Sequence, residues 1–201
     1  NPFSSTVEQL RALRSQLLLR WFDPAVNRKS LAVVSPGEGD GRSFVAANLA
    51  VVFSQLGERT LLVDADLRSP RQHSLFRLAN KSGFSAVLAN RAGLSECVRR
   101  IPGLLGLSVL TAGPVPPNPQ ELLSRPAFAK LLNAVHGHFD IVIFDTPATE
   151  TVSDAQFISS QAKGALVVAS KNRTQVEDLR ALSANLAQNG VTVVGSLLNR
   201  T

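Results

Sequence analysis

The sequence has no methionine, no tyrosine, one tryptophan and one cysteine. Because Cys97 has no second cysteine to pair with, no internal disulfide can form, and a reducing cytoplasm suits such a chain. No apolar run approaches the roughly 20 residues that a membrane-spanning helix needs, and no signal peptide is visible. Methionine is missing even at position 1, so we expect the chain to be a fragment of a longer protein.

Lysine is also scarce, since only five of the 21 basic residues are lysines. The net charge of +6 is compatible with nucleic acid, anionic lipid, nucleotide phosphates or an acidic protein as partner. The arginines are spread along the chain and lack the aromatic interleaving of a single-strand binder. We therefore expect no nucleic-acid partner.

Apolar strands alternate with amphipathic helices along most of the chain. The pattern predicts strands at 31–34, 60–63, 104–110, 140–144, 165–169 and 191–198. It predicts helices at 4–22, 42–56, 119–123, 126–135, 153–161 and 174–188, with short helical pieces in the polar segment 69–100. Continuous apolar strands of this kind are typical of a mostly parallel sheet covered by helices on both faces, a three-layer α/β fold. Ligands bind such sheets beyond the carboxyl ends of the strands.

A glycine-rich segment follows the first of these strands, and residues 35–48 read SPGEGDGRSFVAAN. Its glycines allow a turn whose backbone N–H groups point at an anion, and the helix that starts near Arg42 adds its own unpaired donors. Gly41-Arg42-Ser43 stand where a Walker A motif has Gly-Lys-Ser/Thr. The segment therefore predicts a phosphate-binding loop, with these candidate contacts: Gly37, Glu38, Gly39, Asp40, Gly41, Arg42, Ser43 and Phe44.

Carboxylates follow two other predicted strands. Asp145 comes after residues 140–144, in the Walker B position, and Asp64 and Asp66 come after residues 60–63. Ser43 offers a hydroxyl suited to Mg²⁺, which prefers oxygen ligands. One of Asp64 and Asp66 can contact the metal while the other acts as general base. Each feature alone has an ordinary explanation as a turn or a helix cap, but their combination favours a Mg·ATP site.

These segments resemble those of a known family, the bacterial tyrosine kinases (BY-kinases), whose cytoplasmic kinase domains regulate capsule and exopolysaccharide polymerisation and export. SPGEGDGRS is similar to their Walker A motif in place and length, and DIVIFDTPA is similar to Walker B. LLVDADLR resembles their Walker A′ motif, and GPVPPNPQELL resembles their PPNP-x-ELL segment. The last two are the specific ones, because generic P-loop ATPases lack them. The resemblance extends over nearly the whole chain.

The resemblance implies a single P-loop NTPase domain over residues 1–201, with an N-terminal oligomerisation helix at 1–23 and a nucleotide-binding core at 31–201. It implies an ATP-dependent protein-tyrosine kinase that takes ATP or ADP with Mg²⁺. Among the catalytic residues, Asp64 is implied as the base that takes the tyrosine proton, and Arg42 stands in place of the Walker A lysine. Ser43, Asp66 and Asp145 are implied at the metal, Asn199 lies near the adenine, and Arg68 orients the Asp64/Asp66 pair or bridges to a neighbour.

The same resemblance implies partners. Glu8, Arg11 and Arg14 match the family's E-x2-R-x2-R motif, which packs subunits into a ring, although charges spaced in this way also suit a plain solvated helix face. The implied outside partner is the cytoplasmic segment of a membrane polysaccharide co-polymerase. Such a partner places the domain in the cytoplasm, peripheral to the inner face of the bacterial plasma membrane.

Two departures from the family pattern bear on activity. Arg42 keeps the positive charge of the Walker A lysine but is bulkier and planar, so we expect nucleotide binding with weak turnover. No tyrosine is present, so this chain cannot phosphorylate itself on tyrosine.

Two other functions stay open. The first is a nucleotide-gated structural partner, or pseudokinase, of the same machinery. The second is a ParA/MinD-type ATPase, which is disfavoured because residues 31–41 contain no lysine near the start of the loop.

Overall fold

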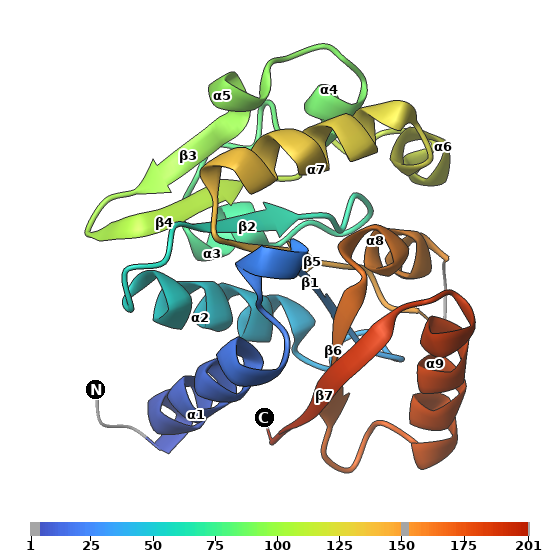
Figure 1. Cartoon of the computed structure of the whole chain (residues 1–201). Helices are drawn as coiled ribbons and strands as arrows, with labels where there is room; N and C mark the ends of the chain where they lie inside the picture. Colours follow the sequence, from blue (N-terminus) through green and yellow to red (C-terminus); the bar gives the residue numbers. More distant parts are fainter. Residues whose placement is uncertain (1–4, 150–152, 201) are drawn as a thin grey trace.

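Seven strands form one sheet in the computed structural model, which describes residues 5–149 and 153–200. Their order across the sheet is β3-β4-β2-β5-β1-β6-β7 (Figure 1). The strands are β1 (Ser30–Val34), β2 (Thr60–Asp64), β3 (Val98–Ile101), β4 (Leu104–Leu110), β5 (Ile141–Asp145), β6 (Gly164–Ser170) and β7 (Thr192–Asn199). All neighbours pair in parallel except β3, which runs antiparallel to β4.

Strand β3 corrects the prediction of short helical pieces throughout 69–100. It is an edge strand with the sequence VRRI, and the side chains of Arg99 and Arg100 are exposed. A single antiparallel partner supplies its hydrogen bonds, so the strand needs no apolar run, and none marks it in the sequence.

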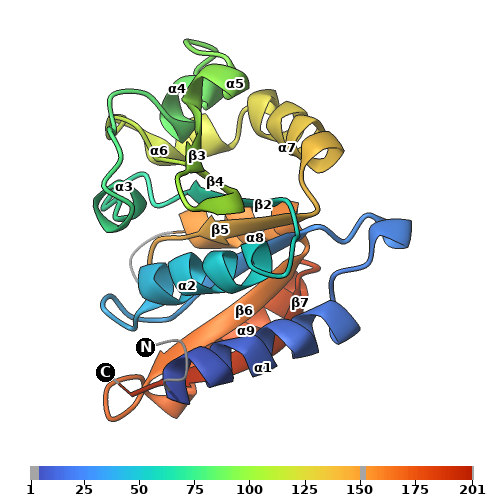
Figure 2. The same ribbon diagram turned by 90° about the vertical axis from the view of Figure 1, so that its left-hand side faces the viewer.

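Helices cover both faces of the sheet, as predicted. One face carries α1 (Ser5–Arg20) and α2 (Arg42–Ser54), which lie side by side in Figures 1 and 2. The other face carries α4 (Phe84–Leu88), α6 (Pro119–Leu123), α7 (Pro126–His138), α8 (Asp154–Ala162) and α9 (Val176–Gln188). The remaining helices are short: α3 (Gln72–Leu75), α5 (Leu94–Cys97) and the 3₁₀ turn η1 (Pro24–Val26).

The side chains of the central strands alternate between the two faces. In β1, Leu31 and Val33 pack with α1 and α2, whereas Ala32 and Val34 pack with the helices of the opposite face. All four are completely buried. Burial on both faces explains why the strands read as continuous apolar runs. The mostly parallel three-layer α/β fold predicted from the sequence is confirmed.

The N-terminal helix is part of this packing. Leu10 and Leu17 of α1 are buried against α2, and the indole of Trp21 donates a hydrogen bond to the Ser30 carbonyl at 2.8 Å. The helix ends at Arg20 rather than at residue 22, and the predicted start at residue 4 lies outside the described residues.

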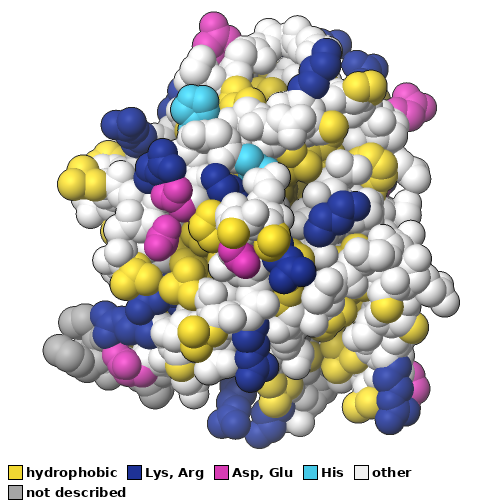
Figure 3. Space-filling view, in the orientation of Figure 1, with side chains coloured by type: hydrophobic (Ala, Val, Ile, Leu, Met, Phe, Trp, Pro, Cys, Tyr) yellow, Lys and Arg dark blue, Asp and Glu magenta, His cyan; other side chains and the backbone are white. Residues whose placement is uncertain are grey.

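Basic side chains are spread over the face shown in Figure 3, where Lys and Arg lie among polar and apolar side chains rather than in one stripe. Within the part of the chain that the structure describes, no helix is both long and apolar enough to cross a bilayer.

Candidate nucleotide site

The glycine-rich loop joins β1 to α2 at the carboxyl edge of the sheet. Helix α2 begins at Arg42, and its first helical bond runs from the Val45 N–H to the Gly41 carbonyl at 2.9 Å. The N–H groups of Arg42, Ser43 and Phe44 therefore have no acceptor within the helix, and they carry the positive end of its dipole. Such a helix start is suited to an anion.

Glycine is required at two positions of this loop. Gly39 has φ +76° and Gly41 has φ +97°, a region that side chains rarely adopt. A Cβ on Gly41 would also collide with the side-chain amide of Asn199, and one on Gly39 with the guanidinium of Arg173. Contacts with these two side chains therefore restrict the backbone conformation of the loop.

A cleft of about 520 Å³ opens beside the loop. The loop, the segment after β2, helix α3 and the segment after β5 form its walls, so it lies at the carboxyl ends of adjacent strands, where the sequence predicts a ligand. Its lining comprises Glu38, Gly39, Gly41, Arg42, Ser43, Phe44, Asp66, Arg68, Ser69, Arg71, Ser74, Leu75, Pro147 and Ala148. No sequence motif marks the contribution of α3.

Arg42 turns much of its guanidinium toward the protein. Its Nε donates to the Thr146 carbonyl at 2.8 Å, and Nη1 donates to the Gly37 carbonyl at 2.7 Å and to Ser35 Oγ. The side chain is 9% exposed. Arg42 thus connects the loop to the segment after β5. Its Nη2 group is the donor that has no protein acceptor among the described residues.

Two predicted phosphate contacts are engaged inside the loop. The Gly37 N–H donates to Asp40 Oδ2 at 3.0 Å, and Thr174 Oγ1 donates to Asp40 Oδ1 at 3.0 Å. Asn199 donates to the Asp40 carbonyl at 3.1 Å and so ties the end of β7 to the loop. These hydrogen bonds stabilise the conformation of the loop, but Gly37, Asp40 and Asn199 do not line the cleft.

Asp64 and Asp145 lie next to each other under the cleft. They are register partners at the ends of β2 and β5, and neither has any exposed surface. Asp64 Oδ2 accepts from the N–H groups of Arg71 and Gln72 at 3.1 and 2.9 Å, and Asp145 Oδ2 accepts from Gln72 Nε2 at 2.8 Å. The Oδ1 atom of each carboxylate is buried without a partner. Gln72 is a site residue that sequence reasoning missed.

Burial makes both carboxylates hard to ionise. Desolvation raises the pKa of Asp64 to about 8, and repulsion from Asp145 adds to the rise. Desolvation also raises the pKa of Asp145 to about 6, although hydrogen bonds from Gln72 and Ser43 oppose it. A cation near these oxygens would reverse the effect.

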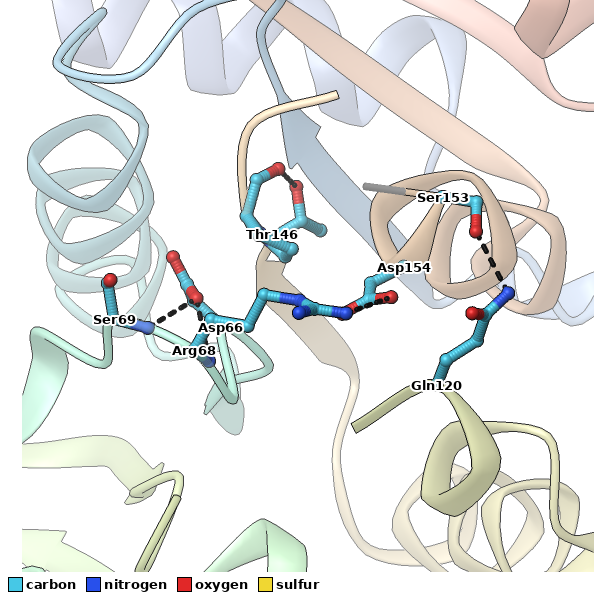
Figure 4. Close-up of polar contacts among 8 residues, drawn as sticks. Asp66, Arg68, Ser69, Gln120, Thr146, Ser153 and Asp154 are labelled. Carbon is cyan, nitrogen blue, oxygen red and sulfur yellow. Dashed lines mark hydrogen bonds and ion pairs between the residues drawn. The ribbon is translucent and has the colours of Figure 1, made fainter. Parts of the chain in front are cut away.

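Asp66 lines the cleft itself, and the contacts around it appear in Figure 4. Its Oδ1 accepts from the N–H groups of Arg68 and Ser69 at 3.1 and 2.9 Å. Arg68 reaches across to Asp154 at the start of α8, with Nε donating to Oδ2 at 2.8 Å. Asp154 is 1% exposed, and this ion pair fixes the loop that carries Asp66.

The donor set fits a divalent cation that arrives with phosphates. Among the described residues, no three His, Cys, Asp or Glu side chains come together to hold a metal by themselves. Mg²⁺ needs only one or two carboxylates when phosphates and water supply its other ligands. Asp145, whose Oδ1 is buried without a hydrogen-bond partner and whose carboxylate lies near the Ser43 side chain, provides that kind of partial site.

The predicted interface residues lie on α1, away from the cleft. Glu8 and Arg11 form an ion pair at 2.6 Å on the outer side of the helix. Arg14 instead turns inward, and its Nη1 donates to the Val52 carbonyl of α2 at 2.8 Å.

Comparisons with known proteins identify the family. A family model described as the CobQ/CobB/MinD/ParA nucleotide binding domain matches residues 31–201. The chain is 36% identical over 200 residues to a putative tyrosine-protein kinase, CapB, of Staphylococcus aureus, covering 99% of this chain and 86% of CapB. It is 38% identical over 198 residues to the tyrosine-protein kinase YwqD of Bacillus subtilis, covering 98% of this chain and 82% of YwqD. The chain belongs to the bacterial tyrosine kinase family.

The structure of this BY-kinase domain agrees with that assignment. The crystal structure of the chimerical protein CapA2B2 superposes on it with a TM-score of 0.93 at 34% identity, covering the whole of this chain and 87% of the other. The nucleotide-binding family model also spans MinD and ParA proteins. CapB and YwqD, at 36% and 38% identity to this BY-kinase domain, both carry tyrosine-protein kinase names.

Proposed function

We propose that the chain is an ATP-dependent protein-tyrosine kinase domain of a capsule or exopolysaccharide machinery. One observation carries the proposal: in a member of this family, the Walker A loop and Asp66 line one cleft, and Asp145 is buried beneath it. The names of CapB and YwqD support the reaction.

In this proposal the backbone of the loop binds the phosphates of ATP. The free N–H groups at the start of α2 provide the donors. The base would sit toward Phe44 and Asn199, which both line a second pocket. Arg42 holds the loop in shape and offers its remaining Nη2 donor to the phosphates. Mg²⁺, held by Ser43 and Asp145, would supply positive charge against the charge that develops on the transferred phosphoryl group.

Burial separates the roles of Asp64 and Asp66. The resemblance implies Asp64 as the base and Asp66 at the metal, but Asp64 has no exposed surface and does not line the cleft, whereas Asp66 does. A general base must come within hydrogen-bond reach of the proton that it takes. We therefore propose that Asp66 faces the tyrosine hydroxyl, while Asp64 caps α3 and sets the charge around Asp145.

The partners are part of the proposal. We infer a ring of copies packed through the exposed Glu8–Arg11 pair of α1, with Arg14 fixing that helix on its own subunit. We also infer a membrane co-polymerase whose cytoplasmic segment holds the domain at the inner face of the plasma membrane.

A structural role without phosphotransfer is the second candidate. The specific observation in its favour is Arg42, whose Nε and Nη1 donors are both engaged by protein acceptors where the family pattern has a lysine. Such a domain would bind nucleotide, and its bound state would control assembly.

A phosphotransfer assay in trans separates the two candidates. The chain lacks tyrosine, so a Glu-Tyr copolymer serves as acceptor, with Mg·ATP as donor. We expect transfer to tyrosine that falls 10²- to 10⁴-fold in Asp66→Asn, while ADP affinity stays near the wild-type value. Wild-type transfer no higher than the background without protein, together with normal ADP binding, would refute the kinase and favour the structural role. Equal transfer above background in both proteins would refute the role of Asp66 alone.

A further inference from the structure

Gln72 occupies the centre of the buried layer beneath the cleft. It is the first residue of α3 and has no exposed surface. Its side-chain Nε2 donates to Asp145 Oδ2 at 2.8 Å and to the Ser43 carbonyl at 3.0 Å, while its backbone N–H donates to Asp64 Oδ2 at 2.9 Å. One residue therefore connects the ends of β2 and β5 with the first turn of α2.

The contact with Asp145 selects which oxygen of that carboxylate is free. A carboxylate can rotate about its terminal bond, and both of its oxygens accept hydrogen bonds. Because Gln72 holds Oδ2, the other oxygen, Oδ1, keeps its lone pairs unused and is buried without a partner. The second bond, to the Ser43 carbonyl, ties the residue that bears the Walker A hydroxyl to the same amide.

The amide is also neutral. Three carboxylates, Asp64, Asp66 and Asp145, act on one another electrostatically in this region. A lysine in place of Gln72 would neutralise the charge that attracts a cation, and a glutamate would add repulsion. A neutral donor orients Asp145 and leaves its charge available.

Packing alone does not account for a glutamine here. Its Oε1 is buried without a hydrogen-bond partner, and such a group destabilises the folded chain. An apolar side chain of similar volume would fill the same space without that cost. The stabilising contribution of this residue must come from its donor end, which contacts Asp145 and Ser43.

We propose that Gln72 is a positioning residue for the divalent cation that accompanies the nucleotide. It orients the Asp145 carboxylate and the first turn of α2 so that Asp145 Oδ1 and the Ser43 hydroxyl are presented together. This role rests on the proposed Mg·nucleotide function of the cleft, and partners that orient a metal ligand typically contribute 10- to 100-fold to metal affinity.

Calorimetry of ADP binding tests the proposal through the ratio of affinities measured with excess Mg²⁺ and with EDTA. Gln72→Met keeps the volume and removes the donor, and Gln72→Asn keeps an amide that is one methylene too short to reach both acceptors. Asn80→Leu is the matched control, because the Asn80 amide also joins two segments outside the cleft. It donates to the Gly113 carbonyl and accepts from the Gly113 N–H.

We expect Gln72→Met to lower the Mg²⁺-dependent gain in ADP affinity about tenfold or more, with the affinity in EDTA unchanged. Gln72→Asn should show a smaller loss of the same kind, and it decides the question if Gln72→Met does not fold. Asn80→Leu should melt at a lower temperature but keep the wild-type ratio.

A wild-type ratio in the Gln72 variants would overturn the positioning role. An equal loss of affinity with and without Mg²⁺ would also overturn it, because that result indicates support of the fold alone. A wild-type chain that binds no ADP would instead refute the proposed function of the cleft, and the positioning role with it.

Discussion

Replacing Arg42 tests whether the cleft depends on this side chain for its shape or for its charge. Arg42 donates to the carbonyls of Gly37 and Thr146 through two different nitrogens, and it is 9% exposed. A hydrogen bond from a charged donor contributes about 1.5–3 kcal/mol, and bonds from one side chain are not additive. We therefore expect Arg42→Ala to lower the free energy of unfolding by about 3 kcal/mol.

For a chain of this size, each 1 kcal/mol corresponds to a change of about 2–4 °C in melting temperature. Arg42→Ala should thus melt roughly 6–12 °C below wild type. Arg42→Lys offers one nitrogen where Arg42 bonds through two, so it cannot bridge both segments and its loss should be about half as large. Arg180→Ala removes the same charge from the exposed face of α9 and should melt like wild type.

Binding should respond differently from stability. Because we propose that the phosphates contact the backbone N–H groups of α2, we expect Arg42→Lys to keep ADP affinity within about tenfold of wild type, which corresponds to about 1.4 kcal/mol. Scanning calorimetry and titration calorimetry measure the two effects on the same samples. The reasoning fails if Arg42→Ala melts with the wild type, or if Arg42→Lys no longer binds ADP.

Three other substitutions test separate parts of the account. Because burial raises the pKa of Asp64 to about 8, the folded chain binds that proton more tightly than the unfolded chain, so stability is lost as pH rises. In EDTA, the wild-type melting temperature should fall between about pH 4, where an unfolded aspartate ionises, and about pH 8, where Asp64 ionises in the folded chain. Asp64→Asn should remove much of this fall, and an identical fall in both would contradict the reasoning. Gly41→Ala should abolish ADP binding, since its φ of +97° and the amide of Asn199 exclude a methyl group, and retained affinity in titration calorimetry would contradict that. Arg14→Ala should lower the free energy of unfolding in urea by about 1–3 kcal/mol by breaking the bond to the Val52 carbonyl, and an unchanged midpoint would assign Arg14 to intermolecular contacts alone.

The parts of this site that depend on local sequence patterns could be predicted. A glycine-rich turn between an apolar strand and a helix predicts the phosphate loop, because few other functions need glycine at those spacings. The carboxylates were predictable as neighbours since parallel strands end at the same edge, and Asp64 and Asp145 do pair in register. The buried strands were predictable because both faces of the sheet are covered.

The rest depends on side-chain directions that no local pattern encodes. Gln72 stands in a polar segment with no motif, and its partner Asp145 is 73 positions away. Arg68 and Asp154 pair over 86 positions, and Arg42 bonds to Thr146 over 104. Strand β3 was missed because it lies at the edge of the sheet, where exposed arginines replace the apolar run that marks a buried strand.

A crystal structure of the chain with ADP and Mg²⁺ tests the central claim most directly. The account predicts that phosphate oxygens accept from the N–H groups at the start of α2. It also predicts Mg²⁺ at about 2.1 Å from Ser43 Oγ, with Asp145 Oδ1 bound to the ion or to one of its waters. A nucleotide seated away from the loop, or an ion that contacts neither Ser43 nor Asp145, would contradict it.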